Sequence, residues 1–98
     1  MVADDLRFEW DEANIGHIAR HQVTSEEAEQ VLRNDPFDLS YETAGTEERW
    51  TVIGHTDNGR VLLVVWTLRG DDVVRVVTAR EASQRASLVY LRQKGFGI

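Results

Sequence analysis

The pattern of apolar and polar positions predicts two helices in the first third of the chain. Asp11 suits a helix N-cap, and the apolar residues after it recur at helical spacing: Ile15, Ile18 and Ala19. We expect this helix to end near Gln22. A second helix is expected after Thr24, because Glu27 stands three residues later and completes a capping box. It should end before Pro36, since the residue preceding a proline is pushed out of the helical region, and its buried stripe should consist of Ala28, Val31 and Leu32.

Shorter apolar runs predict strands in the rest of the chain. Leu6–Trp10 and Phe37–Tyr41 are expected to be short strands, and Glu42–Glu47 is expected to be a loop. A meander of three strands should follow, with turns at Asn58-Gly59 and at Gly70-Asp71.

The end of the chain is predicted to be helical. Thr78-Ala79-Arg80-Glu81 reads as a capping box that opens a helix through about Gln93, with Gly95 as its terminator. The expected fold is therefore of the α+β class, with an antiparallel sheet, two N-terminal helices and one C-terminal helix. With 98 residues, of which 42% are hydrophobic, the chain is expected to form one domain over residues 1–98.

A two-residue turn at Asn58-Gly59 would fix the pairing of the meander. It places Thr51 opposite Trp66. A turn at Gly70-Asp71 then places Trp66 opposite Arg75. Because side chains alternate between the faces of a sheet, one face collects the residues expected to pack on the first two helices: Trp50, Val52, Leu63, Val65, Thr67, Val74, Val76 and Thr78.

The second face of this predicted sheet mixes arginine, tryptophan and hydroxyl groups: Arg49, Thr51, Ile53, Val64, Trp66, Leu68, Val73, Arg75 and Val77. A partly covered ligand surface would account for the mixture. So would a face on which Trp66 packs under the last helix while the two arginines pair with the carboxylates of Glu48, Asp72 or Glu81. The sequence leaves both interpretations open.

Composition and charge narrow the function classes. The chain has no cysteine, which excludes thiolate chemistry and fits a cytoplasmic protein, and no apolar run reaches the roughly 20 residues of a membrane helix. Residues 1–48 carry 13 acidic and 3 basic residues, whereas residues 49–98 carry 4 and 8, so the net charge of −6 conceals a basic half. Ten of the 11 basic residues are arginine, the side chain best suited to phosphate or carboxylate.

Asn14, His17 and His21 fall on one side of the first predicted helix, next to Arg20. Two histidines four residues apart can chelate a metal, but the chain has no H-E-x-x-H motif and its third histidine, His55, lies near a hairpin. We expect no metal and no other cofactor. This side of the helix is then either a solvated face or a site of general acid–base catalysis. The second interpretation is open because the side chain of histidine ordinarily exchanges a proton near neutral pH.

An ordered series of short motifs resembles the BrnT family of toxins over roughly residues 8–90: Phe8-Glu9-Trp10-Asp11, Arg20-His21, Ser25-Glu26-Glu27-Ala28, Asp35-Pro36, Glu48-Arg49, Ile53-Gly54, the strand Arg60–Trp66, and the run from Arg75 to Ala82. The resemblance implies a RelE-like fold, ribonuclease activity on an RNA substrate, and a ribbon-helix-helix antitoxin as partner. It leaves open a homodimer or a hetero-oligomer with the antitoxin.

The chain matches the family at His21, Arg49, Arg80 and Tyr90 and departs from it at other positions. Arg20 stands where lysine is common. Lysine is usual at Asn14, asparagine at His17 and glycine at Gln22, and the last helix has Ala86 and Ser87 in place of a glutamate and an arginine.

RNA cleavage without a metal needs a base, an acid and positive charge around the phosphorane. Arginines supply the charge, so the expected catalytic set consists of His21, Arg49, Arg80, Arg20 and His17. Arg75 should contact RNA, and Trp66 or Tyr90 should stack a base. An alternative stays open: a weakened or silent protein of the same fold that retains only its partner interaction.

Overall fold

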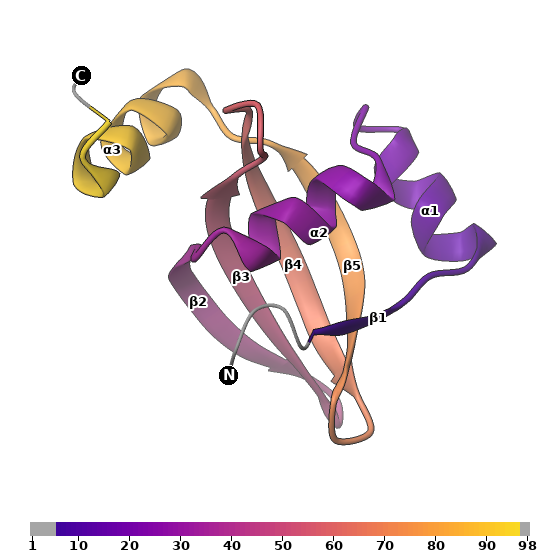
Figure 1. Ribbon diagram of the computed structural model, residues 1–98. Coiled ribbons are helices and arrows are strands. Elements are labelled where there is room, and N and C mark those ends of the chain that lie inside the picture. The colour runs from indigo at the N-terminus through magenta and orange to yellow at the C-terminus, as the bar shows by residue number, and fades with distance from the viewer. Residues whose placement is uncertain (1–5, 97–98) are drawn as a thin grey trace.

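The computed structural model describes residues 6–96 and consists of one sheet and three helices (Figure 1). In chain order the elements are β1 (Arg7–Glu9), α1 (Glu12–Ala19), α2 (Ser25–Arg33), β2 (Phe37–Ala44), β3 (Glu47–His55), β4 (Val61–Arg69), β5 (Val73–Glu81) and α3 (Gln84–Lys94). The sheet order is β1-β5-β4-β3-β2. The predicted α+β class and order of elements are confirmed. The sheet is mixed rather than purely antiparallel, because β1 pairs with β5 in parallel.

Both predicted N-terminal helices begin at the caps read from the sequence. The Asp11 side chain accepts hydrogen bonds from the backbone N–H groups of Ala13 and Asn14, and Asn14 Oδ1 accepts one from the backbone N–H of Asp11. Thr24 and Glu27 form the expected capping box at the start of α2. Each box satisfies backbone N–H groups that a helix start would otherwise leave without partners.

Helices α1 and α2 cover one face of the sheet, which we call the helix-covered face. Their side chains share one buried cluster with β3, β4 and β5: Ile18, Val23, Ala28, Val31, Leu32, Val52, Leu62, Val64, Val74, Val76 and Ala79. Gly54 permits the close approach of α2, because a Cβ atom at this position would lie 2.9 Å from Val31 Cγ1. The opposite face of the sheet is called the open face below.

The predicted register between β3 and β4 is wrong by one residue. The hairpin has a three-residue loop, Asp57–Gly59, closed by a hydrogen bond of 2.8 Å from Thr56 N to Arg60 O. Gly59 has a positive φ of 90°, whereas Asn58 does not adopt a positive φ. The loop therefore differs from the two-residue turn, which needs positive φ at both positions. Trp50 pairs with Trp66 as a result.

The turn between β4 and β5 is also one residue longer than predicted. Arg69 pairs with Val73, so Gly70 to Asp72 form the loop, and Trp66 pairs with Val76 instead of Arg75. A bulge then leaves Val77 unpaired, because Val65 pairs with Thr78. The bulge moves Thr78 onto the open face.

These shifts invert the faces predicted for β4. Trp50 and Trp66 lie on the same, helix-covered face and stack with ring centroids 4.6 Å apart. The prediction that they lie on opposite faces is therefore wrong. Val65 and Thr67, predicted to contact the first two helices, lie on the open face instead.

Two element boundaries also differ from the sequence prediction. Strand β2 continues to Ala44 and turns at Gly45 and Thr46, where a loop was expected from Glu42. The capping box predicted to begin at Thr78 is part of β5, which continues through Glu81 because it pairs with β4 as far as Leu62. Helix α3 begins three residues later, and Ser83 is its N-cap.

Helix α3 packs at one end of the open face (Figure 1). It contributes to a second buried cluster with strands β3 and β4 and the segment that follows β5: Ile53, Val61, Ala82 and Tyr90, with Phe37, Leu63, Ala86 and Leu91 around them. None of the three helices within residues 6–96 covers the rest of the open face.

Candidate functional site

A cleft of about 470 Å³ lies where α1 borders β5, and it extends across β4 to β3. We call it the arginine cleft. Its lining combines one histidine, three arginines, one carboxylate, one amide, two hydroxyl groups and three small apolar side chains: Ala13, Asn14, His17, Glu47, Arg49, Thr67, Arg69, Arg75, Val76, Val77 and Thr78. The cleft therefore brings together three residues predicted to be functional: His17, Arg49 and Arg75.

Asn14 fixes the position of α1 against the sheet. Its side chain is buried, and Nδ2 donates to the backbone oxygens of Glu9 at 3.0 Å and Val76 at 3.2 Å. His17 lies one turn further along α1, and its Nε2 is 3.0 Å from the hydroxyl oxygen of Thr78. The amide of Asn14 thus serves as an anchor that directs the imidazole of His17 over the edge of β5 into the cleft.

The three arginines of the cleft are paired with carboxylates of the same chain. Arg49 Nε lies 2.7 Å from Glu47 Oε1, and Arg69 Nε lies 3.5 Å from Glu9 Oε1. Arg75 is the least exposed of the three, with 14% of its side chain accessible, and its Nη1 lies 2.9 Å from Glu9 and 3.0 Å from Asp11.

Arg75 and Asp11 each change the pKa of the other. The hydrogen bond from Arg75 lowers the pKa of the Asp11 carboxyl, and the same bond raises the pKa of the guanidinium. Ion pairs of Arg49 and Arg75 were among the interpretations left open by the sequence. The partners expected for them, Glu48, Asp72 and Glu81, are wrong, since the carboxylates come from positions 47, 9 and 11.

Other predicted site residues surround the cleft without lining it. The His21 ring is 5.6 Å from the His17 ring, measured between centroids, so the two histidines form a pair on α1. Arg20 is exposed at the end of that helix. Arg80 is an exposed residue of β5, opposite Leu63 and two residues beyond Thr78, so it lies further along the same open face.

Trp66 and Tyr90 lie away from the arginine cleft. Trp66 stacks on Trp50 on the helix-covered face. Tyr90 is only 2% exposed, and its hydroxyl oxygen is 2.7 Å from His55 Nδ1. Burial raises the pKa of the Tyr90 hydroxyl. A nucleotide base in the arginine cleft has no access to either ring, so neither belongs to the site that the cleft defines.

Four residues of the cleft were missed by the sequence analysis: Glu47, Thr67, Arg69 and Thr78. The hydroxyl of Thr67 donates to the backbone oxygen of Glu48 at 2.6 Å, which ties β4 to β3 at the floor of the cleft. Glu47 stands two residues before Arg49 on the same strand, and this spacing could have placed both on one face. The two threonines could not be found in this way. Thr67 was assigned through the incorrect register of β4, and Thr78 is moved to the open face by the bulge at Val77.

Neither a metal centre nor a membrane helix is found in the part of the chain that the structure describes. Residues 6–96 contain no group of three or more histidine or carboxylate side chains that could hold a metal ion. No helix in this range combines the length and the apolar character needed to cross a membrane.

Comparison with known proteins identifies the family. Residues 10–86 match a family described as the ribonuclease toxin BrnT of type II toxin–antitoxin systems. The fold is similar to the crystal structure of the ribonuclease toxin BrnT from Brucella abortus, with a TM-score of 0.60 and 23% sequence identity over 81% of this chain and 99% of that one. No curated protein matches the sequence. Because the match covers most of its length, this chain belongs to the BrnT family of type II toxin–antitoxin ribonuclease toxins.

Proposed function

We propose that this chain cleaves RNA in the arginine cleft without a metal ion and that a ribbon-helix-helix antitoxin neutralises it in the cytoplasm. The observation that carries the proposal is the convergence of His17, Arg49 and Arg75 on one cleft. A proton-exchanging group beside fixed positive charge is the minimum that phosphodiester cleavage by an internal hydroxyl requires. The antiparallel meander of β2 to β5, preceded by two helices, supports a RelE-like assignment of the fold.

The proposed reaction is attack of the ribose 2′-hydroxyl on the adjacent phosphorus. A base takes the proton of the 2′-hydroxyl, the new P–O2′ bond forms, the P–O5′ bond breaks, and an acid protonates the departing 5′-oxygen. The products are a 2′,3′-cyclic phosphate and a 5′-hydroxyl. His17 and His21 are the proton-exchanging groups, and either can act as the base or the acid.

The arginines would stabilise the negative charge that develops on the phosphorane. Guanidinium groups remain protonated at every physiological pH and bind two phosphate oxygens at once, which suits them to this role. Arg75 is already oriented by two carboxylates, so it need not be ordered when RNA binds. Arg49 is more exposed and has a single carboxylate partner, which makes it the better candidate for direct contact with the scissile phosphate.

A second candidate function is a protein that binds its antitoxin but cleaves RNA poorly or not at all. Two observations favour it. Asn14 occupies the position where the family usually has lysine, and here its amide is committed to backbone contacts. The arginines of the cleft are also neutralised by carboxylates, so an RNA phosphate must compete for them.

The deciding assay incubates the purified protein with RNA in the presence of EDTA and analyses the ends of the fragments. Cyclic phosphate ends that are lost in a His17→Ala or Arg49→Ala variant would support the proposed reaction. Cleavage that stops when EDTA is added would contradict its metal independence. If the unaltered protein cleaves nothing, even with ribosomes present, the silent binding protein becomes the better interpretation.

A further inference from the structure

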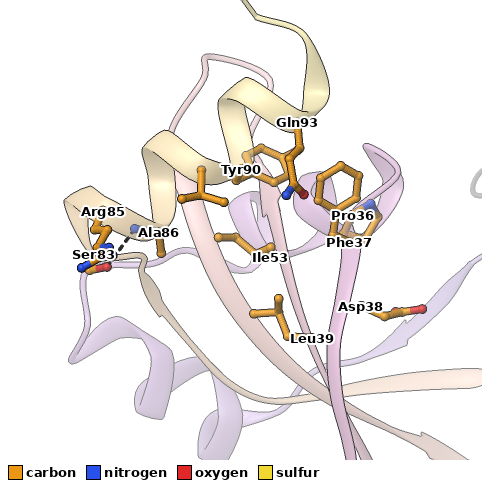
Figure 2. Close-up of a pocket in the computed structure, with 11 residues that line it drawn as sticks. Pro36, Phe37, Asp38, Leu39, Ile53, Ser83, Arg85, Ala86, Tyr90 and Gln93 are labelled. Carbon is orange, nitrogen blue, oxygen red and sulfur yellow. Dashed lines mark hydrogen bonds between the residues drawn. The ribbon is translucent and has the colours of Figure 1, made fainter. Parts of the chain in front are cut away.

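A second concave surface, separate from the arginine cleft, lies between α3 and the strands β2 and β3 (Figure 2). This groove has a volume of about 820 Å³. Ile53 and Leu39 come from the sheet, and Ala86 and Tyr90 face them from α3. Val89 of α3 also lines the groove. We call it the α3 groove.

Apolar side chains in the α3 groove remain open to solvent. Leu39 is 54% exposed and Val89 is 48% exposed, although both are aliphatic. Leu39 lies at the bulge of β2, where the pairing with β3 shifts between Asp38 and Ser40. A bulge redirects a side chain of an edge strand, and here it leaves Leu39 beside the groove. Exposed aliphatic residues that face one another across a groove mark a site for an apolar partner.

The charges around the α3 groove define what kind of partner fits. Helix α3 carries Arg85, Arg92 and Lys94 and no acidic residue. Arg85 lines the groove at one end. At the other end Lys94, whose Nζ lies 3.4 Å from Asp35 Oδ2, covers the Phe37 ring at 5.3 Å from its centroid without lining the groove. Asp38 is the acidic residue of the lining, and its side chain points away from α3 (Figure 2). The groove therefore has an apolar floor and, on its α3 side, a wall whose charged lining residue is Arg85; we call this side the basic wall.

This combination disfavours two other occupants. A second copy of the chain that packed its own α3 against this helix would bring two basic helices together. RNA would be attracted by the arginines but would gain little from Leu39 and Val89. An acidic polypeptide segment with an apolar residue at its centre could pack that residue on the apolar floor and pair its carboxylates with the basic wall.

The groove and the arginine cleft are connected along β3. Ile53 lines the groove and Arg49 lines the cleft, and both project from the open face of the same strand. They are four positions apart, or about 13 Å of extended strand. A partner segment seated in the groove needs only about four further residues to reach the cleft and cover it.

We propose that the α3 groove anchors an acidic, amphipathic segment of the antitoxin, with an apolar side chain between Leu39 and Val89, and that the continuation of this segment covers the arginine cleft. The identity of the partner rests on the function proposed above. The location of the contact does not, because it follows from the apolar floor and the basic wall alone.

The test uses the protein encoded by the reading frame next to the toxin gene, purified and titrated against the full-length toxin. Val89→Asp should weaken the complex by about 30-fold or more, the loss typical of a central interface residue. The matched control is Leu88→Asp, since Leu88 lies on the same helix and is 39% exposed but does not line the groove. This control should bind normally. Arg85→Glu should weaken binding, and more strongly at low salt than at high salt.

RNA cleavage and oligomeric state are measured on the same variants. Unchanged cleavage by Val89→Asp, together with lost neutralisation, supports the groove as the antitoxin anchor. If the unaltered toxin proves inactive on RNA, weakened binding by Val89→Asp beside normal binding by Leu88→Asp supports the anchor. Four results would overturn the proposal: normal binding by Val89→Asp, equal loss in the Leu88 control, loss of RNA cleavage in Val89→Asp, or a toxin dimer that this change dissociates. Failure of the neighbouring protein to bind the unaltered toxin would overturn it as well.

Discussion

The imidazole of His17 and the hydroxyl of Thr78 lie 3.0 Å apart, joining α1 to β5 at the rim of the arginine cleft. The contact depends on two features that are distant in sequence. Asn14 attaches α1 to the backbone of β5, and the bulge at Val77 turns Thr78 onto the open face. The contacts of Asn14 and the bulge at Val77 therefore act together to hold His17 at the cleft.

Replacing His17 by alanine should reduce RNA cleavage by about 10²-fold or more, the usual contribution of a general acid or base. One limb of the pH–rate profile should also flatten, because a group that transfers a proton in the reaction is gone. Fragment production measured across pH 5 to 9 checks both effects. A uniform loss of rate at every pH would mean that His17 contributes through structure and not through proton transfer.

His21→Ala is the matched comparison for this variant, since the two rings contact each other on the same helix. If the two histidines serve as base and acid, each alanine variant should flatten a different limb of the profile. Thr78→Val should have a smaller effect than either, because it removes only the hydroxyl that orients the His17 ring.

Arg49→Ala should lower the cleavage rate by about 10²–10³-fold, as observed when a single preorganised donor to a developing negative charge is removed. The loss should fall on kcat more than on KM, because the charge that Arg49 would meet develops in the transition state. Arg80→Ala extends the test along β5. A loss as large as that of Arg49→Ala would place Arg80 in the catalytic site, and a small loss would restrict the site to the cleft.

Gln22→Gly should stabilise the fold by about 0.5–1 kcal/mol. Gln22 has a φ of 62°, in the left-handed region, and two hydrogen bonds enforce it at the end of α1: Gln22 N to Ala19 O at 3.0 Å and Val23 N to Ile18 O at 3.1 Å. A left-handed residue with a side chain costs roughly 1–2 kcal/mol, and the extra freedom of glycine in the unfolded chain offsets part of the gain.

Urea denaturation measures this change in the free energy of unfolding. Gly95 gives the reverse control, because it closes α3 with the same bond pattern at a φ of 82°. Gly95→Gln should destabilise the protein by a similar amount. A Gln22→Gly variant less stable than the unaltered chain would show that the glutamine side chain has a compensating contact.

Glu27 should make the stability of the fold dependent on acid pH. Burial raises the pKa of its carboxyl, but the backbone N–H of Thr24 and the guanidinium of Arg60 outweigh burial, so the pKa lies below its ordinary value of 4.5. A lowered carboxyl pKa in the folded state contributes stability above the unfolded pKa. That contribution is lost as the pH falls through the folded value.

Glu27→Gln should therefore cost about 1 kcal/mol at pH 7, where the ion pair with Arg60 is intact at 3.1 Å. The difference between the two proteins should shrink as the pH falls below the ordinary carboxyl value of 4.5 and through the lowered pKa of the folded state, because the unaltered Glu27 becomes protonated over that range. Thermal unfolding at several pH values checks this. A stability difference that stays constant from pH 7 to pH 3 would contradict the assignment.

The sequence was sufficient to predict the elements but not the pairing of β4. Both caps of the N-terminal helices could be read because capping is local. The hairpin could not, since Asn58-Gly59 is compatible with a two-residue turn and also with a three-residue loop that puts only Gly59 at positive φ. In the observed loop the buried Thr56 hydroxyl donates to Asn58 Oδ1 at 2.6 Å and accepts from the backbone N–H of Arg60 at 3.0 Å, contacts that the Asn58-Gly59 pair alone does not reveal.

The errors in the two turns cancel between β3 and β5, and this explains which parts of the site were predicted. Arg49 and Arg75 were placed correctly on the open face because each loop is longer by one residue and the second shift reverses the first. Strand β4 lies between the two shifts and was inverted, so Thr67 was missed and Trp66 was wrongly included. Thr78 was missed because nothing local in the sequence marks the bulge at Val77.

The ion pairs of the arginine cleft have a consequence for how binding there responds to salt. A basic surface that binds nucleic acid usually gains affinity by releasing mobile ions, and its affinity falls steeply as salt is added. Arg49 and Arg75 are already paired with carboxylates of the same chain, those of Glu47, Glu9 and Asp11, which cannot be released into solution. An RNA phosphate would therefore exchange one anion for another, so the affinity of this cleft should vary less with salt than its number of arginines implies.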